Sequence, residues 1–149
     1  MNDRCAYEQG LQRRPDGVDD ATVEAVGKVS EALETIEGAR GYLYRFHQLM
    51  GRADLLLGEA CDQLRDAGHY SIAERLATEM VGRNVLPGRW SFQIVEDFDD
   101  GYWSVFREEE RRVRDQLLHG VRHVFEAEMK QDRRTHGHPG HDAAPTDSP

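Results

Sequence analysis

The stretch "RGYLYRFHQLMGRADLLLGE", from Arg40 to Glu59, lies inside the longest helical pattern of the chain. An apolar stripe with seven-residue spacing passes through it and contains Val29, Ile36, Leu43, Met50, Leu57 and Leu64. A second series with the same spacing runs beside it and contains Val26, Leu33, Arg40, His47, Asp54 and Cys61. Side chains seven residues apart share one helix face. The stretch therefore predicts a long helix whose covered face turns polar halfway along.

The helical pattern extends from a cap at Asp19 or Asp20 to about Ala67, where Gly68 is suited to end a helix. An unbroken helix of this length measures roughly 70 Å, whereas a compact domain of this size is roughly 40 Å across. Either the helix breaks, with Gly51 and Gly58 as candidate points, or a second copy covers the overhang. Small residues recur at sevens and are interrupted only by Phe46: Ala25, Ala32, Ala39, Ala53 and Ala60. This series favours a homodimer through the first helix.

The remaining segments predict further helices. Ser71 and Glu74 have the spacing of a capping box, which predicts a shorter helix that ends near Asn84. The segment "WSFQIV", which begins at Trp90, alternates apolar and polar residues. We expect it to be an extended aromatic connector packed on helices, with strand pairing across a dimer as the alternative. The segment "EDFDDG" predicts a loop, after which the last helix runs from about Tyr102 to about Asp132.

Together these patterns predict an all-α fold, in which long antiparallel helices form a bundle with one shorter helix and the extended aromatic connector. Residues 1–18 are polar and aperiodic, and we expect a flexible N-terminal segment there. Residues 19–134 are expected to form a single helical domain. Residues 135–149 are small, polar and rich in proline, which predicts a disordered C-terminal tail.

The polar part of the second series requires partners. Arg40, His47 and Asp54 lie near the middle of the apolar face, and an unpaired buried charge costs several kcal/mol. Positions seven apart are separated by about 10.5 Å along a helix, so these residues cannot pair with one another. Glu110 is the expected partner, because it interrupts the apolar face of the last helix, and Tyr44 lies close enough to join.

Three interpretations of this polar set stay open. It can be a structural network that fixes register or oligomeric state. It can be a site between facing helices, with His47, Asp54 and Glu110 as candidate metal ligands or acid–base groups. Otherwise the helix breaks near Gly51 and the face is partly solvated. No cofactor is predicted, and a divalent metal is the alternative that the second interpretation implies.

Composition excludes several classes of partner. The 149 residues carry a formal net charge of −9, and the basic stretch "REEERRVR" is balanced by its own glutamates. This acidic protein is therefore not expected to bind nucleic acid or an anionic membrane. Cys5 and Cys61 are the only cysteines, and no apolar leader or membrane span is found. We expect a cytoplasmic protein.

Histidine-containing patterns near the C-terminus are weak metal signals. One set has helical spacing and contains Asp115, His119, His123 and Glu126. It points away from the predicted core stripe, so we expect a solvated face. The sequence has no phosphate-binding glycine loop and no complete catalytic motif. Whether the protein is an enzyme stays open, and this absence favours a non-enzyme.

The segment "MVGRNVLPGRW", from Met80 to Trp90, and the following "SFQIVEDFDDGYW" resemble a family of helical proteins from actinobacteria. The resemblance covers roughly residues 26–130 and implies no activity or catalytic residue. It leaves open whether the turn before Trp90 belongs to a functional surface or only docks that side chain. The first functional hypothesis is a non-catalytic helical oligomer, a homodimer, that acts as an interaction or structural protein, with another protein partner also open. The alternative is a helical bundle that binds a metal or a small ligand between the first and last helices.

Overall fold

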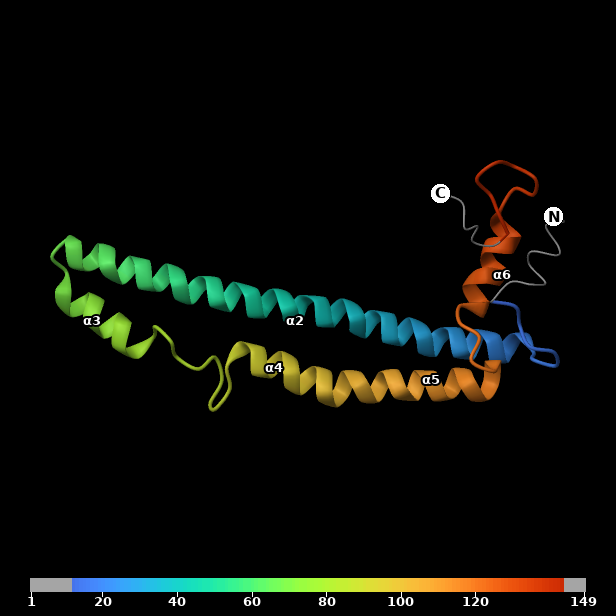
Figure 1. The fold of residues 1–149 in the computed structure, drawn as a ribbon, viewed down its shortest axis with the longest axis horizontal. Helices are drawn as coiled ribbons and strands as arrows, with labels where there is room; N and C mark the ends of the chain where they lie inside the picture. Colours follow the sequence, from blue (N-terminus) through green and yellow to red (C-terminus); the bar gives the residue numbers. More distant parts are fainter. Residues whose placement is uncertain (1–11, 144–149) are drawn as a thin grey trace. The chain divides into compact units, whose positions relative to one another are not determined.

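The computed structural model describes residues 12–143, which are mostly helical (72%) and contain no strand or sheet in this range. The all-α prediction is confirmed. The elements follow one another as α2 (Asp20–Asp66), α3 (Tyr70–Glu79), α4 (Ser91–Phe98), a π-helical turn η1 (Asp99–Trp103), α5 (Ser104–Leu118) and α6 (Val124–Arg133) (Figure 1). No helix within the described range is both long enough and apolar enough to cross a lipid bilayer.

The chain divides into two compact units. The first comprises Met1–Thr35 and Phe106–Pro149, and the second comprises Ile36–Val105. Helices α2 and α5 each contribute to both units. The polar set Arg40, His47 and Asp54 belongs to the second unit, whereas Glu110 belongs to the first.

Helix α2 is continuous from Asp20 to Asp66 and passes through Gly51 and Gly58 without a break. The Asp19 carboxylate accepts a hydrogen bond from the backbone N–H of Thr22 at 2.8 Å, as the predicted cap requires. Gly68 has φ +85°, so the prediction that it ends this helix is confirmed. Both seven-residue series lie on the less exposed face of α2, and Val26 and Cys61 are fully buried.

In the first unit, a small core joins the start of α2 to the end of α5 and the start of α6. It is formed by Val23, Val26, Leu118 and Val124. The Arg14 guanidinium stabilises the start of α2, because it donates to both Glu128 carboxylate oxygens at 2.8 Å and to Asp20 at 2.7 Å. The expected single last helix is wrong, because the chain leaves helical geometry between α5 and α6. His119 and His123 both have positive φ there and do not share a helix face.

The expected extended connector is also wrong, because residues 91–98 form the helix α4. Gln93 is half-buried, and the other less exposed residues have helical rather than alternating spacing: Ser91, Ile94, Val95 and Phe98. The side-chain oxygen of Gln93 accepts from the backbone N–H of Trp90 at 3.0 Å, which helps to start the helix. The predicted loop "EDFDDG" is part of the same helical run, and its aspartates do not begin a separate helix.

Helix α3 forms where a short helix was predicted, but without the predicted capping box. It begins at Tyr70 and ends at Glu79, and its start has no side-chain cap. The Glu74 carboxylate instead accepts a hydrogen bond from Arg65 of α2 at 2.8 Å. This contact ties α3 back to α2 across the short turn that joins them.

The predicted terminal segments are only partly covered by the described residues. Residues 1–11 and 144–149 lie outside them, and so does Cys5. At the C-terminal side, Arg134 is buried and donates to the carbonyl oxygen of His141 at 2.9 Å. The backbone N–H of Thr135 donates to Nδ1 of the same histidine at 3.2 Å. Residues 134–141 thus form a local loop that is closed by side-chain contacts.

The continuity of α2 predicts that Gly51→Ala stabilises the protein. A Cβ added at Gly51 meets no atom within 4 Å, so the substitution should raise the free energy of unfolding by about 0.5–1 kcal/mol through helix propensity. This corresponds to a rise in Tm of about 1–4 °C, measured by circular dichroism. Gly120→Ala is the matched control, because φ is +79° and the added Cβ would lie 3.1 Å from Asp115 Oδ1. It should lower Tm, and a lowered Tm for Gly51→Ala would show a break in α2 at that point.

Candidate functional site

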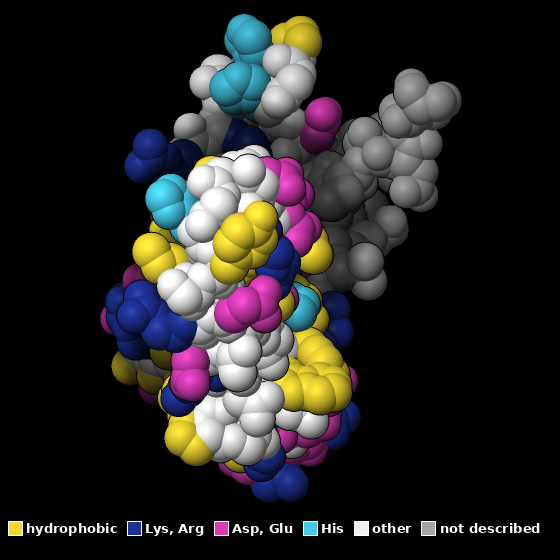
Figure 2. Space-filling model, turned by 90° about the vertical axis from the view of Figure 1, so that its left-hand side faces the viewer, with side chains coloured by type: hydrophobic (Ala, Val, Ile, Leu, Met, Phe, Trp, Pro, Cys, Tyr) yellow, Lys and Arg dark blue, Asp and Glu magenta, His cyan; other side chains and the backbone are white. Residues whose placement is uncertain are grey.

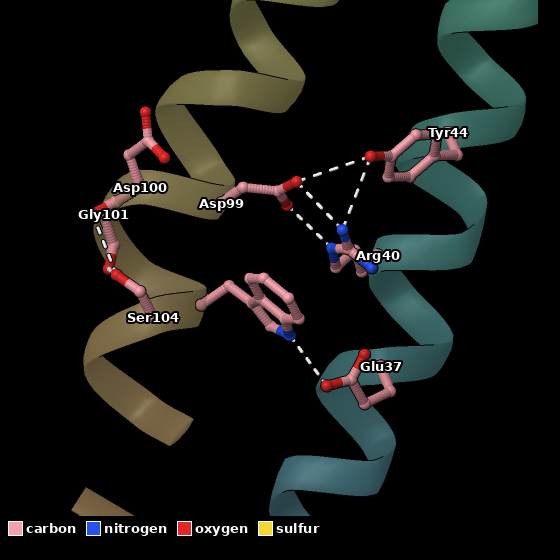
Figure 3. Close-up of polar contacts among 8 residues, drawn as sticks. Glu37, Arg40, Tyr44, Asp99, Asp100, Gly101 and Ser104 are labelled. Atoms are coloured by element: carbon pink, nitrogen blue, oxygen red, sulfur yellow. Dashed lines mark hydrogen bonds and ion pairs between the residues drawn. The ribbon is translucent and has the colours of Figure 1, made fainter. Parts of the chain in front are cut away.

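Of the three residues in the polar set, Arg40 makes the most contacts within the chain (Figure 3). Its Nε donates to Asp99 Oδ1 at 2.7 Å and its Nη2 donates to Asp99 Oδ2 at 2.9 Å, which gives a bidentate ion pair. The guanidinium also stacks on the Trp103 ring, with 3.9 Å between Cζ and the ring centroid. Tyr44 stands at the edge of this group, with its hydroxyl 3.4 Å from Arg40 Nη2 and 3.5 Å from Asp99 Oδ2.

The π-helical turn η1 explains why Asp99 and Trp103 both reach Arg40. They are the first and last residues of this turn, and they present the carboxylate and the ring to the same guanidinium. The Trp103 indole N–H donates to Glu37 at 2.7 Å, which fixes the ring orientation. Ser104 donates to the Asp100 carbonyl oxygen at 2.9 Å, and so satisfies an oxygen at the turn.

His47 and Asp54 are each tied to a different part of the chain that returns from α3. His47 Nδ1 shares a hydrogen bond of 2.8 Å with the hydroxyl of Ser91, the first residue of α4. Asp54 Oδ1 accepts from the backbone N–H of Gly82 at 2.7 Å, directly after α3. Arg40, His47 and Asp54 therefore contact three successive positions of the returning chain rather than one another.

A pocket of about 480 Å³ lies beside Asp54 in the second unit. The segment after α3 forms much of its wall through Met80, Gly82, Arg83, Asn84 and Val85. Met50 and Leu57 supply apolar surface from α2, and Trp90 and Ser91 complete the lining. The pocket thus combines apolar walls with a guanidinium, an amide, a hydroxyl and a carboxylate.

The segment Met80–Trp90 shapes one side of this pocket. The residues Leu86 to Arg89 form a tight turn, with Arg89 N–H donating to the Leu86 carbonyl at 3.0 Å and Gly88 at φ +71°. After the turn, Trp90 remains 56% exposed and packs edge-on against Phe92, with 5.3 Å between ring centroids. The turn therefore places Trp90 at the pocket without burying it.

Glu110 is not the partner that the sequence suggested. It is buried, and its Oε1 accepts from Ser30 at 3.1 Å and from Arg114 at 3.2 Å. Arg114 also donates to the carbonyl oxygen of Gly120 at 2.8 Å, at the end of α5. Through Arg114, Glu110 is thus linked to the turn between α5 and α6 in the first unit.

The candidate metal ligands His47, Asp54 and Glu110 do not form a cluster within residues 12–143. A different group in that range, Glu34, His123 and Glu126, brings one ligand atom of each residue to within 4.8 Å of the others. Two of these residues belong to the set with predicted helical spacing, but Glu34 comes from α2. Glu34 and His123 are exposed, and exposed acidic groups of this kind are common without a bound ion.

The Arg40–Asp99 pair has a clear electrostatic signature. The hydrogen bonds from Arg40 lower the pKa of the Asp99 carboxyl below its ordinary value, and those to Asp99 raise the pKa of Arg40. A carboxyl whose pKa is lower in the folded state adds stability above its ordinary pKa of about 4. That stability is lost as the pH falls through the folded-state pKa.

Comparison with known proteins adds no family to this picture: no family model, curated protein or solved structure matches the chain. The resemblance to actinobacterial proteins therefore stays a prediction.

The ion pair predicts that removing one partner costs more stability than removing both partners together. Arg40→Leu leaves the Asp99 carboxylate without its partner, and its side chain is only 19% exposed. We expect a loss of about 1–3 kcal/mol in the free energy of unfolding, and Arg40→Leu/Asp99→Leu should recover part of it. Urea denaturation measures both values.

Arg89→Leu is the matched control, because the Arg89–Asp97 pair is exposed on both sides and should contribute little. The loss caused by Arg40→Leu should also shrink as the pH falls from about 4 through the lowered pKa of Asp99, because the wild-type carboxylate becomes protonated over that range. Equal effects of Arg40→Leu and Arg89→Leu at neutral pH would contradict a structural role for the pair.

Proposed function

We propose that the protein is a non-catalytic interaction module that works as a homodimer, with α2 as the dimer element. The observation that carries this proposal is an outer seam on the second unit's part of α2, beside the covered face. Its residues alternate three and four apart in the sequence: Ala39, Tyr42, Phe46, Leu49, Ala53, Leu56 and Ala60. Such spacing is typical of a helix that packs along another helix.

The outer seam is apolar and uncovered. Tyr42 is 80% exposed, Leu56 51%, Leu49 44% and Phe46 39%, whereas only Ala60 is half-buried. Full burial of a large apolar side chain contributes about 1.5–3 kcal/mol, so a second helix on this face would remove a substantial cost. Isolated exposed apolar residues are common, but a continuous seam of this kind indicates an interface.

The polar set supports an interaction role rather than catalysis. Arg40, His47 and Asp54 each have a partner within the chain, so none of them needs a substrate to satisfy its charge or hydrogen bond. On the face that Figure 2 shows, acidic and basic side chains are interspersed with apolar ones. This mixture suits a protein partner better than a polyanion. We place the protein in the cytoplasm, where the free, buried thiol of Cys61 would persist.

The proposal predicts that a charge in the outer seam separates the copies. Leu49→Glu and Ala53→Glu should each shift the protein to a monomer in multi-angle light scattering, because a carboxylate would enter an apolar interface. Leu55→Glu is the matched control: Leu55 is 71% exposed but lies outside the seam, so this variant should keep the wild-type mass. An unchanged mass for folded Ala53→Glu and Leu49→Glu would remove the outer seam from the interface.

A second candidate function is favoured by the pocket beside Asp54, which is large enough for a small ligand. Its apolar walls, the exposed Trp90 ring and the Arg83 guanidinium fit an aromatic anion. This would agree with the sequence-based alternative of a ligand-binding bundle, although Met80–Trp90 rather than the last helix faces α2 here.

Anilinonaphthalene sulfonate, a fluorescent aromatic anion, probes this candidate. Trp90→Ala and Arg83→Ala should each weaken its binding about fivefold, because a ring contact and a charge contact are worth about 1 kcal/mol each. Leu49→Glu serves as the control and should keep the affinity, since that residue lies outside the pocket lining. If Trp90→Ala binds the dye as the wild type does, the pocket is not the binding site.

A further inference from the structure

A row of charged residues, called the charged row below, lies beside the outer seam on α2. Arg45, Arg52 and Glu59 follow one another at seven-residue spacing, and all three are exposed. No hydrogen bond or ion pair ties any of them to another residue of the described part of the chain. On a helix that pairs through the outer seam, these residues occupy the flanking positions that set partner choice and orientation.

On the opposite side of the outer seam, the flanking positions are Leu43, Met50 and Leu57. They belong to the apolar stripe, which lies on the less exposed face of α2. Only the charged row is therefore free to meet the corresponding row of a second copy. Because the two flanks of the outer seam differ, a parallel and an antiparallel helix pair bring different residues together.

We infer that two copies of the chain pair antiparallel through the outer seam, with Arg45 of each copy facing Glu59 of the other. The inference rests on the proposed homodimer and adds the orientation and register of its interface. In an antiparallel pair, the two charged rows lie on the same side and run in opposite directions. Arg45 then meets Glu59 at both ends of the contact, and Arg52 meets its own copy at the exposed centre.

In a parallel pair of helices, the same residues would make less favourable contacts. Each charged row would then face the apolar flank of the other copy, with Arg45 near Met50, and the charges would have no partner. The seam itself would also pair identical residues. Tyr42 would crowd against Tyr42, while Ala53 opposite Ala53 would leave a gap.

The antiparallel register instead places large residues opposite small ones. When Arg45 faces Glu59, Tyr42 of one copy lies opposite Ala60 of the other, and Leu49 lies opposite Ala53. Alternation of large and small side chains across facing positions lets the two helices approach closely. Size and charge along α2 thus favour the same orientation and the same register.

Disulfide cross-linking tests the orientation directly. Tyr42→Cys and Ala60→Cys are made in a Cys5→Ser background, and Cys61 is kept because it is 1% exposed. The two new positions are about 27 Å apart on one helix, so they report separate parts of the interface. Under mild oxidation, a mixture of the two variants should give a cross-linked dimer, and neither variant alone should do so, because only opposed residues can form a disulfide.

Each other outcome has a definite meaning. If light scattering shows a dimer and each variant cross-links with itself, the pair is parallel: the inference fails and the homodimer stands. If the protein is dimeric and no combination cross-links, the outer seam is not paired in this register, and the inference is again overturned. A monomeric wild type would refute the homodimer as well.

Charge reversal gives a second readout that needs no cysteine. Arg45→Glu and Glu59→Arg should each raise the dimer dissociation constant about tenfold, because attraction becomes repulsion at both ends of the contact. The combination Arg45→Glu/Glu59→Arg should restore the wild-type value. Additive weakening in the double variant would overturn the inference, because it would show that the two residues do not meet.

Discussion

The ion pair between Arg40 and Asp99 is the interaction on which the second unit depends. A guanidinium on the covered face of α2 is costly unless its charge and hydrogen bonds are satisfied. Asp99 accepts two hydrogen bonds from it, and the Trp103 ring covers it at 3.9 Å. Both partners come from one π-helical turn, so the position of that turn along α2 is fixed by a single side chain.

Two further polar residues of α2 follow Arg40 at seven-residue intervals, and each also binds the returning chain. His47 holds the start of α4 through Ser91, and Asp54 holds the chain after α3 through the Gly82 backbone. An apolar stripe alone would allow the returning chain to slide, because apolar contacts are not directional. The alternation of aliphatic and polar residues on this face therefore sets the register of the returning chain, and leaves the pocket between the Asp54 and Ser91 contacts.

The sequence was sufficient to predict the long helix, its polar face and the all-α class, because these features follow from periodicity within one element. The partners could not be predicted in the same way. Asp99 lies in "EDFDDG", whose composition is typical of a turn, yet it stands four residues before Trp103 on a helical surface. Trp90, Phe92 and Ile94 alternate like a strand, but Ile94, Val95 and Phe98 carry the helical spacing that prevails.

Glu110 is a polar residue whose partners were predicted wrongly from the sequence. It interrupts an apolar face as the polar set does, and the sequence alone gave no reason to separate them. The fold places Glu110 in the first unit, where Ser30 and Arg114 satisfy its carboxylate. Which polar groups meet depends on how elements far apart in sequence pack, and one helix pattern does not contain that information.

Two neighbouring faces of α2 thus have different roles. One face holds the returning chain through polar contacts, and the proposed homodimer pairs through the outer seam beside it. The solution mass of the wild-type protein tests this account most directly. Light scattering over a dilution series should give twice the chain mass of 17.0 kDa at high concentration, falling toward one chain mass on dilution. A mass of one chain at every concentration would contradict the account.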